Sequence, residues 1–244
     1  MLKIKDIKSA NCDNRPKGIE IDTIIYHYTG MRSHEEALSR LCDVNAKVSA
    51  HYMVLENGEI IRLVAEEMQA WHAGISCWNG KAALNENSIG IEIVNPGHEF
   101  GYKKFPQIQM DAVLALSLDI LSRHKVPKRN IIGHSDVAPL RKKDPGELFD
   151  WRFLAENGVG TWPIVEGVRN PEKVLAVFGD DNDSVLNIQE KLSNYGYHLK
   201  KDGYYGEKTE DTIVAFKRHF IQDDMNAFWN SRAMATIDAL LSLN

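Results

Sequence analysis

The stretch GHSDVAPLRKKDPG, residues 133–146, carries side chains that can do chemistry together. His134 offers a nitrogen donor and Asp144 an oxygen donor, and two prolines stiffen the segment around them. The cations at 141–143 admit two interpretations. They form an exposed ion cluster around Asp144, or they place an electrophilic lysine beside a metal site. The second interpretation requires another histidine elsewhere in the chain.

His27 is the candidate partner, near the end of the β-branched stretch IEIDTIIYHYTG at residues 19–30. Strand ends commonly deliver functional side chains to a crevice, and His134 also follows a short predicted strand, RNIIGH. A catalytic zinc needs three nitrogen or oxygen ligands and an open position, which His27, His134 and Asp144 would supply. The spacing leaves an alternative open, because no H-E-x-x-H motif is present. In that alternative the histidines are core or surface residues and Asp144 is a turn residue before a proline.

Glu92 is a carboxylate in the middle of an otherwise apolar predicted strand, SIGIEIVNPG at residues 88–97. Alternation places the isoleucines on one face and Glu92 on the other. Near a metal, Glu92 would accept a proton from water as a general base. The alternative is a carboxylate paired with a buried arginine or lysine. Lys142 would stabilise an oxyanion, or it is an ordinary surface lysine.

The segment WHAGISCW, residues 71–78, is bracketed by tryptophans and contains a histidine. Its aromatic side chains would stack on sugars or fill the core. We predict that His72 and Trp78 line the substrate cleft.

The elements that must position these residues alternate between strand and helix. Besides the strands above, HYMVLE and EIIRLV flank Asn57-Gly58, the signature of a two-residue hairpin turn. Ser33 and Glu36 form a capping box before a short helix, and a longer helix is predicted from Pro106 to about His124. This order predicts an α/β fold with a mixed central β-sheet flanked by helices.

After about Gly167 the predicted secondary structure changes from mixed strands and helices to helices alone. Three helical patterns follow, at residues 184–195, 208–220 and 231–243, and their apolar stripes would close a small three-helix core. We therefore predict a first domain at residues 1–168 and a three-helix C-terminal domain at residues 169–244.

Composition limits the partners. The 244 residues carry a formal net charge of −5, so no basic field favours nucleic acid or an anionic membrane. No apolar run reaches the length of a membrane span, and the N-terminal residues lack the apolar region of a signal peptide. The three cysteines are widely spaced, which argues against a disulfide framework and against a cysteine-rich zinc site.

Several motifs together resemble the zinc-dependent N-acetylmuramoyl-L-alanine amidases of the amidase-2 family, which are related to the peptidoglycan recognition proteins. These motifs are IIYHYTG, VSAHYMVLENG, AWHAGISCWNG, NSIGIEIVNPG and GHSDVAPLRKKDPG, in the order of the family, within roughly residues 10–165. The resemblance implies that one zinc ion per chain is bound by His27, His134 and Asp144. It further implies that Glu92 is the catalytic glutamate and that Lys142, rather than its neighbours, is the catalytic lysine.

Two features depart from relatives of this family. Some relatives use cysteine as the third ligand where this chain has Asp144, and phage-type relatives carry a tyrosine where this chain has Ala50. A catalytic role for that tyrosine is therefore not carried over. The tail resembles a three-helix peptidoglycan-binding module through IQEKLSNYGY and DGYYGEKTEDTIVAFK.

The resemblance implies a hydrolase of the amide bond between N-acetylmuramic acid and L-alanine, acting on peptidoglycan or on soluble muropeptides. The alternative is a non-catalytic peptidoglycan recognition protein. We expect a monomer. The tail favours the periplasm or cell envelope, whereas the missing signal peptide favours the cytoplasm.

Overall fold

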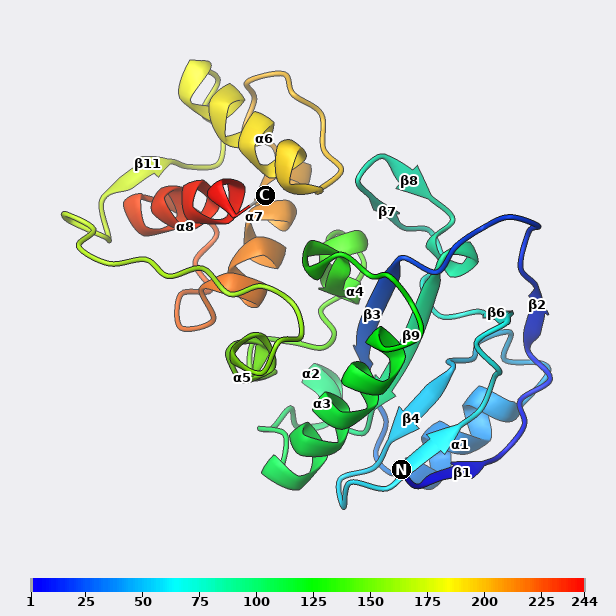
Figure 1. Ribbon diagram of the computed structural model, residues 1–244. Helices are drawn as coiled ribbons and strands as arrows, with labels where there is room; N and C mark the ends of the chain where they lie inside the picture. Colours follow the sequence, from blue (N-terminus) through cyan, green and yellow to red (C-terminus); the bar gives the residue numbers. More distant parts are fainter. Residues whose placement is uncertain (1, 244) are drawn as a thin grey trace.

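The computed structural model describes residues 2–243 and confirms a mixed central sheet flanked by helices (Figure 1). Its strand order is β1-β5-β4-β9-β3-β10. All neighbouring pairs are parallel except β4 and β5, which are antiparallel. The bounds are β1 Ile4–Asp6, β3 Thr23–Tyr28, β4 Tyr52–Val54, β5 Ile60–Arg62, β9 Ser88–Ile93 and β10 Ile131–Gly133.

One face of the sheet is apolar and lies under α3, Gln107–Leu121 (Figure 1). Alternate residues of β3 and β9, such as Tyr26 and Ile91, pack there against Val113 and Leu116 of the helix. Because successive side chains of a strand point to opposite faces, His27 and Glu92 lie on the other face, as their sequence patterns predict.

This second face is covered only at its two sides. On one side α1, His34–Cys42, packs through Ala37 and Leu41 on Met53 of β4. Its predicted cap is confirmed, because the hydroxyl of Ser33 accepts a hydrogen bond from the amide of Glu36 at 3.3 Å. On the other side, Ile25 and Ile132 join the core cluster that continues into the C-terminal helices. The space between the two sides holds the polar ends of β3 and β9.

The hairpin of β4 and β5 forms, but the predicted two-residue turn is wrong. The amide of Leu55 donates to the carbonyl of Glu59 at 2.9 Å, and the amide of Gly58 donates to the carbonyl of Leu55 at 2.9 Å. The loop therefore comprises residues 56–58. Gly58 has φ +83° and Asn57 is not in the left-handed region, so the turn needs one glycine-type residue and not the two that a type I′ turn requires.

Smaller elements connect the layers. They are β2 Cys12–Asn14, β6 Met68–Ala70, β7 Cys77–Trp78, β8 Lys81–Ala82, α2 Gly97–Phe100, α4 His134–Val137, α5 Trp151–Glu156 and the 3-10 turns Leu84–Glu86 and Lys128–Asn130. Among residues 2–243, no helix is long and apolar enough to cross a bilayer.

The C-terminal helices are confirmed almost residue for residue: α6 is Asp183–Tyr195, α7 is Glu207–Phe220 and α8 is Ser231–Ser242. Their apolar stripes face one another, and the side chain of Asn182 caps α6 by accepting from the amides of Ser184 and Val185. A short ribbon of β11, Val174–Ala176, and β12, Trp229–Asn230, closes the group. We call residues 174–243 the C-terminal unit.

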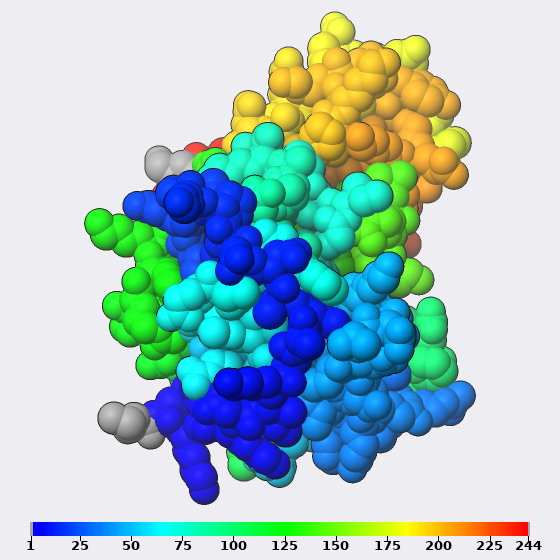
Figure 2. Space-filling view, turned by 90° about the vertical axis from the view of Figure 1, so that its right-hand side faces the viewer, coloured from blue at the N-terminus to red at the C-terminus, as the bar shows by residue number. Residues whose placement is uncertain are grey.

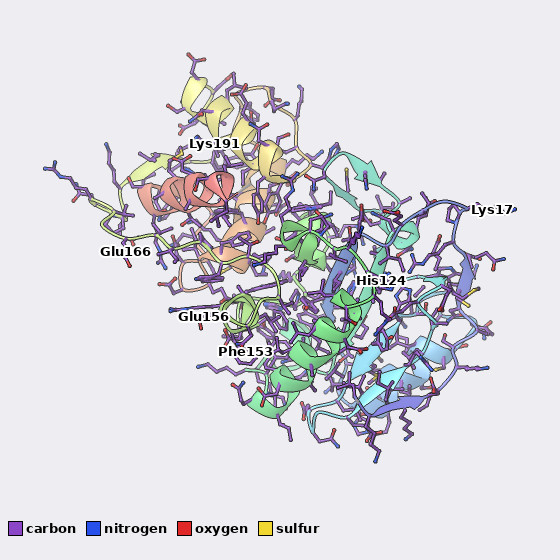
Figure 3. All side chains as sticks on the ribbon, in the orientation of Figure 1. Lys17, His124, Phe153, Glu156, Glu166 and Lys191 are labelled. Carbon is purple, nitrogen blue, oxygen red and sulfur yellow. The ribbon has the colours of Figure 1, made fainter. Side chains whose placement is uncertain are left out.

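The C-terminal unit shares its core with the sheet part of the molecule. A single cluster contains Ile132 and Val137 from the first part together with Phe216 and Trp229 from the second. The unit lies on one end of the molecule, beside the cyan segment that carries β7 and β8 (Figure 2). The chain reaches it from α5, where Glu156 is labelled, through the stretch that carries Glu166 (Figure 3). The division at residue 168 stays a prediction.

Trp78 anchors this shared core. It is 2% exposed, and its ring lies 5.0 Å from that of Tyr197 and 6.0 Å from that of Tyr195, measured between centroids. Trp71, by contrast, is half-buried and donates its indole N–H to Asp13 at 2.7 Å.

We expect Trp78→Ala to lower the free energy of unfolding by about 3–5 kcal/mol, because it empties a large volume between the two parts. Trp71→Ala is the control, because it removes the same type of side chain from a half-buried position. It should lower the free energy of unfolding much less. Urea denaturation followed by circular dichroism measures both. Equal losses for the two variants would contradict the shared core.

Candidate metal centre

Strand register brings the site together. In the parallel pair β3 and β9, His27 stands opposite Glu92, and in the pair β10 and β3, Gly133 stands opposite Tyr26. His134, the next residue after Gly133, is thereby carried beside His27. Parallel strands share one carboxyl edge, so three side chains from distant parts of the sequence meet there.

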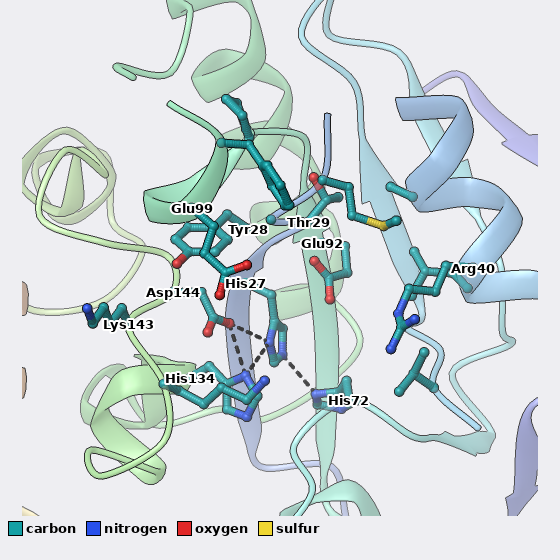
Figure 4. A pocket seen from close by; sticks show the side chains of 18 of the residues that line it. His27, Tyr28, Thr29, Arg40, His72, Glu92, Glu99, His134, Lys143 and Asp144 are labelled. Carbon is teal, nitrogen blue, oxygen red and sulfur yellow. Dashed lines mark hydrogen bonds and ion pairs between the residues drawn. The ribbon is translucent and has the colours of Figure 1, made fainter. Parts of the chain in front are cut away.

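Three donor atoms converge at this edge. His27 Nδ1 lies 3.0 Å from His134 Nδ1, and each of these nitrogens lies 3.0 Å from Asp144 Oδ2. All three residues are buried. Figure 4 shows the two rings and the carboxylate turned toward a common point. The structure thus brings together the three predicted ligands.

The proton on His134 is fixed by a main-chain carbonyl. His134 Nε2 lies 3.1 Å from the carbonyl oxygen of Ala73, which can only accept. The proton of a neutral His134 ring is therefore on Nε2, and Nδ1 presents a lone pair to the cluster.

The proton on His27 is fixed by a longer chain of hydrogen bonds. The hydroxyl of Ser88 donates to the carbonyl of Leu84 at 2.5 Å, so its oxygen accepts from His72 Nε2 at 3.2 Å. His72 Nδ1 is then left to accept from His27 Nε2 at 3.0 Å. Burial lowers the pKa of His72 well below its ordinary value, which keeps this ring neutral. His27 Nδ1 consequently presents a lone pair as well.

Three lone pairs facing one another without a proton between them form a site for a cation. A zinc ion with bonds of about 2.0–2.1 Å in a tetrahedron holds its ligand atoms about 3.3 Å apart, close to the spacing found here. Burial and the neighbouring His134 lower the pKa of His27 to about 4. Burial alone would raise the pKa of Asp144, but His134 and His27 lower it far below its ordinary value. Neutral imidazole and ionised carboxylate are the forms that bind metal.

Glu92 lies next to this cluster without belonging to it. Its Oε2 is shielded from solvent and has no hydrogen-bond partner among the described residues. The alternative of a buried ion pair is therefore not found within residues 2–243. Burial, and next the charge of Asp144, raise the pKa of Glu92 well above its ordinary value, while Lys142 opposes the rise. A carboxyl with a raised pKa near a metal is suited to exchange protons during a reaction.

The three cations of the loop separate into different environments. Lys142 is half-buried and lines the cleft with His134 and Asp144. Lys143 is exposed. Arg141 is exposed, as expected for a surface cation, and its guanidinium in addition donates to the carbonyls of Ala73 at 3.2 Å and Ile75 at 2.6 Å. Arg141 thus ties the loop to the same segment that orients His134.

The cluster opens into a cleft of about 710 Å³. Its walls are α1, the loop at 141–144 and the residues around Phe100; Arg40 extends from α1 into the opening (Figure 4). His72 lines the inner end of the cleft and is only 8% exposed. The structure does not bring Trp78 to the cleft, since Trp78 lies in the shared core.

Sequence reasoning missed the groups behind the ligands, namely Ala73, Ser88 and the position of His72 behind His27. One signal was present in the strand itself. A Cβ atom on Gly90 would lie 2.3 Å from the ring of His72. The glycine of SIGIE therefore makes room for the histidine that supports His27.

We expect His72→Ala to weaken zinc binding about 10–100-fold, because the Nε2–H of His27 loses its acceptor and the ring its orientation. Competition with a chromophoric chelator measures the affinity. His124→Ala is the control: it removes a half-buried histidine whose ring contacts Glu66 at 2.7 Å rather than the candidate ligands. Unchanged zinc affinity in His72→Ala would show that the hydrogen-bond chain has no part in binding.

Comparison with known proteins agrees with this geometry. The family model of the N-acetylmuramoyl-L-alanine amidases matches residues 17–147, and a peptidoglycan binding domain model matches residues 181–221. Neither match reaches the predicted boundary at 168. The amidase match contains all three donors, Glu92 and Lys142.

Related proteins match most of the chain. The N-acetylmuramoyl-L-alanine amidase AmiD of Escherichia coli (strain K12) is 36% identical over 239 residues, which cover 91% of this chain and 82% of that protein. A structure of AmiD in complex with the substrate anhydro-N-acetylmuramic acid-L-Ala-D-γ-Glu-L-Lys has a TM-score of 0.78 at 34% identity, and the match covers 94% of this chain and 93% of the chain in that structure. AMPDH3 of Pseudomonas aeruginosa, in complex with anhydromuramic pentapeptide, has a TM-score of 0.78 at 29% identity, with coverages of 93% and 94%.

The amidase model matches more than half of this chain, and AmiD resembles nearly the whole of it. The site described above agrees with both findings. This chain belongs to the N-acetylmuramoyl-L-alanine amidase family and is an enzyme of that family.

Proposed function

We propose that this amidase uses one zinc ion, held by His27, His134 and Asp144, to hydrolyse the amide bond between N-acetylmuramic acid and L-alanine. The observation that carries the proposal is the convergence of three donor atoms beside Glu92, whose Oε2 has no hydrogen-bond partner within residues 2–243. The resemblance of the motifs to the family implies the same three ligands, which supports the proposal.

When bound, the ion supplies Lewis acidity to the amide carbonyl and lowers the pKa of water at the site. Glu92 takes a proton from the attacking water as its oxygen forms the C–O bond, and then delivers that proton to the nitrogen of L-alanine, so that the C–N bond breaks and the C=O bond is restored. Lys142, on the same cleft wall as Asp144, stabilises the negative charge that develops on the carbonyl oxygen. The products are a carboxylate on the muramic acid and a free amine on the peptide.

The substrate we propose is a soluble muropeptide with a 1,6-anhydro sugar. Both substrate-bound relatives hold anhydromuramyl peptides. The cleft here presents exposed cations, Arg40 and Lys143, on either side of the metal centre, and these suit the carboxylates of a stem peptide. We further propose that the protein acts as a monomer in the cell envelope, where the matched peptidoglycan binding domain at 181–221 would contact the wall.

A non-catalytic recognition protein is the other candidate that the sequence left open. An incomplete catalytic site would support that function. This chain instead has all three donors, the carboxylate and the lysine in one cleft. No observation favours the binding role over the enzyme.

We expect Glu92→Gln to lower kcat about 10²–10⁴-fold while zinc remains bound, because the amide keeps the shape of the side chain but cannot exchange the proton. Chromatography of the released peptide measures turnover, and atomic absorption measures zinc. Glu190→Gln, which changes an exposed carboxylate on α6, should be unaffected. Wild-type protein stripped by a chelator should be inactive until zinc is restored. Wild-type turnover in Glu92→Gln would remove Glu92 from the mechanism.

The choice of substrate has its own test. We expect the full-length protein to cleave a purified anhydromuramyl tetrapeptide, because the cleft is open to a short charged peptide. Release of stem peptides from intact sacculi, assayed in parallel, gives the ratio of kcat/KM for the soluble and the polymeric substrate. Cleavage of sacculi without cleavage of the anhydromuropeptide would contradict the proposed substrate.

A further inference from the structure

The loop that supplies two of the three donors is held from behind by the C-terminal unit. We define the metal loop as residues 133–149, which contain His134, Lys142 and Asp144. The end of α7 lies against it, and contacts from the unit reach both ends of the loop.

At the first end of the metal loop, the contact is made through Asp136. This carboxylate is 1% exposed. Its Oδ2 accepts from the amide of Gly133 at 2.8 Å and from His219 Nδ1 at 2.8 Å, and its Oδ1 accepts from the hydroxyl of Tyr197 at 2.7 Å. Two of its three donors thus come from the C-terminal unit.

The ring of His219 is itself fixed by stacking. Its centroid lies 3.7 Å from that of Trp151 and 3.8 Å from that of Phe220, with interplanar angles of 19° and 7°. Trp151 is the first residue of α5, directly after the metal loop. His219 therefore bridges the beginning of the loop, through Asp136, and the element that follows its end.

At the other end of the metal loop, two more residues of the unit make polar contacts. Arg218 Nε lies 3.6 Å from Glu147 Oε2, and the side-chain amide of Gln222 donates to the carbonyl of Phe149 at 2.7 Å. Arg218 is 7% exposed and Glu147 is half-buried, so this ion pair is partly shielded from water.

These contacts bear on the metal because Asp136 and His134 share one short helix. Asp136 accepts from the amide of Gly133 at the start of α4, and His134 is the first residue of that helix. A buried carboxylate that lost its donors would have to move toward water or toward other donors. The single turn of α4 would move with it, and metal ligation tolerates errors of only about 0.2 Å in ligand distance.

We propose that the C-terminal unit is a positioning element of the metal centre, in which Tyr197 and His219 hold Asp136 and thereby fix the position of His134. This role is separate from contact with the cell wall. It rests on the proposed zinc site. Tyr197 and His219 are not among the residues that line the cleft, and we regard them as positioning residues.

The test compares two buried tyrosines of the same unit. Tyr197 and Tyr205 are 2% and 0% exposed, and each donates one hydroxyl hydrogen bond, to Asp136 and to the carbonyl of Ala227 respectively. Each phenylalanine variant removes one buried hydroxyl. Only Tyr197→Phe removes a contact to the metal loop. Tyr205→Phe removes a contact that lies within the C-terminal unit.

In full-length protein, we expect Tyr197→Phe to weaken zinc affinity about five- to tenfold. This factor corresponds to the loss of one hydrogen bond that holds His134 in position through Asp136. We also expect it to shift the visible absorption bands of the cobalt(II)-substituted protein, which report ligand geometry. Tyr205→Phe should lower the melting temperature of the metal-free protein but leave both zinc affinity and the cobalt spectrum as in the wild type.

Two results would overturn the inference, and they differ from failure of the zinc site. Wild-type zinc affinity and cobalt spectrum in Tyr197→Phe would show that the unit does not position His134. Equal loss of affinity in both variants would show a general effect of stability. A wild-type protein that bound no zinc would instead overturn the proposed function, together with the inference that rests on it.

Discussion

The metal centre depends on two main-chain carbonyls that can only accept hydrogen bonds. The carbonyl of Ala73 places the proton of His134 on Nε2, and the carbonyl of Leu84, acting through Ser88 and His72, does the same for His27. Both Nδ1 atoms are left as lone pairs that face an ionised carboxylate. Three buried acceptors without a donor are unfavourable in a protein interior. The fold therefore holds an arrangement that a bound cation stabilises.

Strand register explains why the carboxylate of Glu92 stands beside this centre without joining the three donors. Glu92 is paired with His27 across parallel strands, and neighbouring strands are about 4.8 Å apart. That separation keeps the carboxylate within reach of a reacting group yet outside the cluster of donors. Burial of the carboxylate at this place raises its pKa.

Much of the fold could be predicted because its signals are local. The periodic stripes of the C-terminal helices and the cap at Ser33 each depend on residues a few positions apart. The metal ligands could not be derived from spacing, since His27 and Asp144 meet only after the sheet forms, and resemblance to a family supplied them. The prediction of the turn at Asn57 is wrong because the turn depends on backbone geometry that no pattern of side-chain types records. The hydrogen bonds of Arg141 to main-chain carbonyls could not be predicted for the same reason. Contacts such as that of Asp136 with His219 join distant segments through particular rotamers, and no sequence pattern signals them.

The supports of the site are unequally distributed around it, and this has a consequence for catalysis. The metal loop is held behind by Tyr197 and His219 and on the inner side by the segment at Ala73, whereas the cleft side carries exposed groups such as Arg40. A catalyst gains most when the reacting groups are already in place before the substrate arrives. Flexible surface cations can adjust to a peptide at small cost, because their movement leaves the ligands undisturbed. A unit related to wall-binding modules has thus become part of the rigid side of the active site.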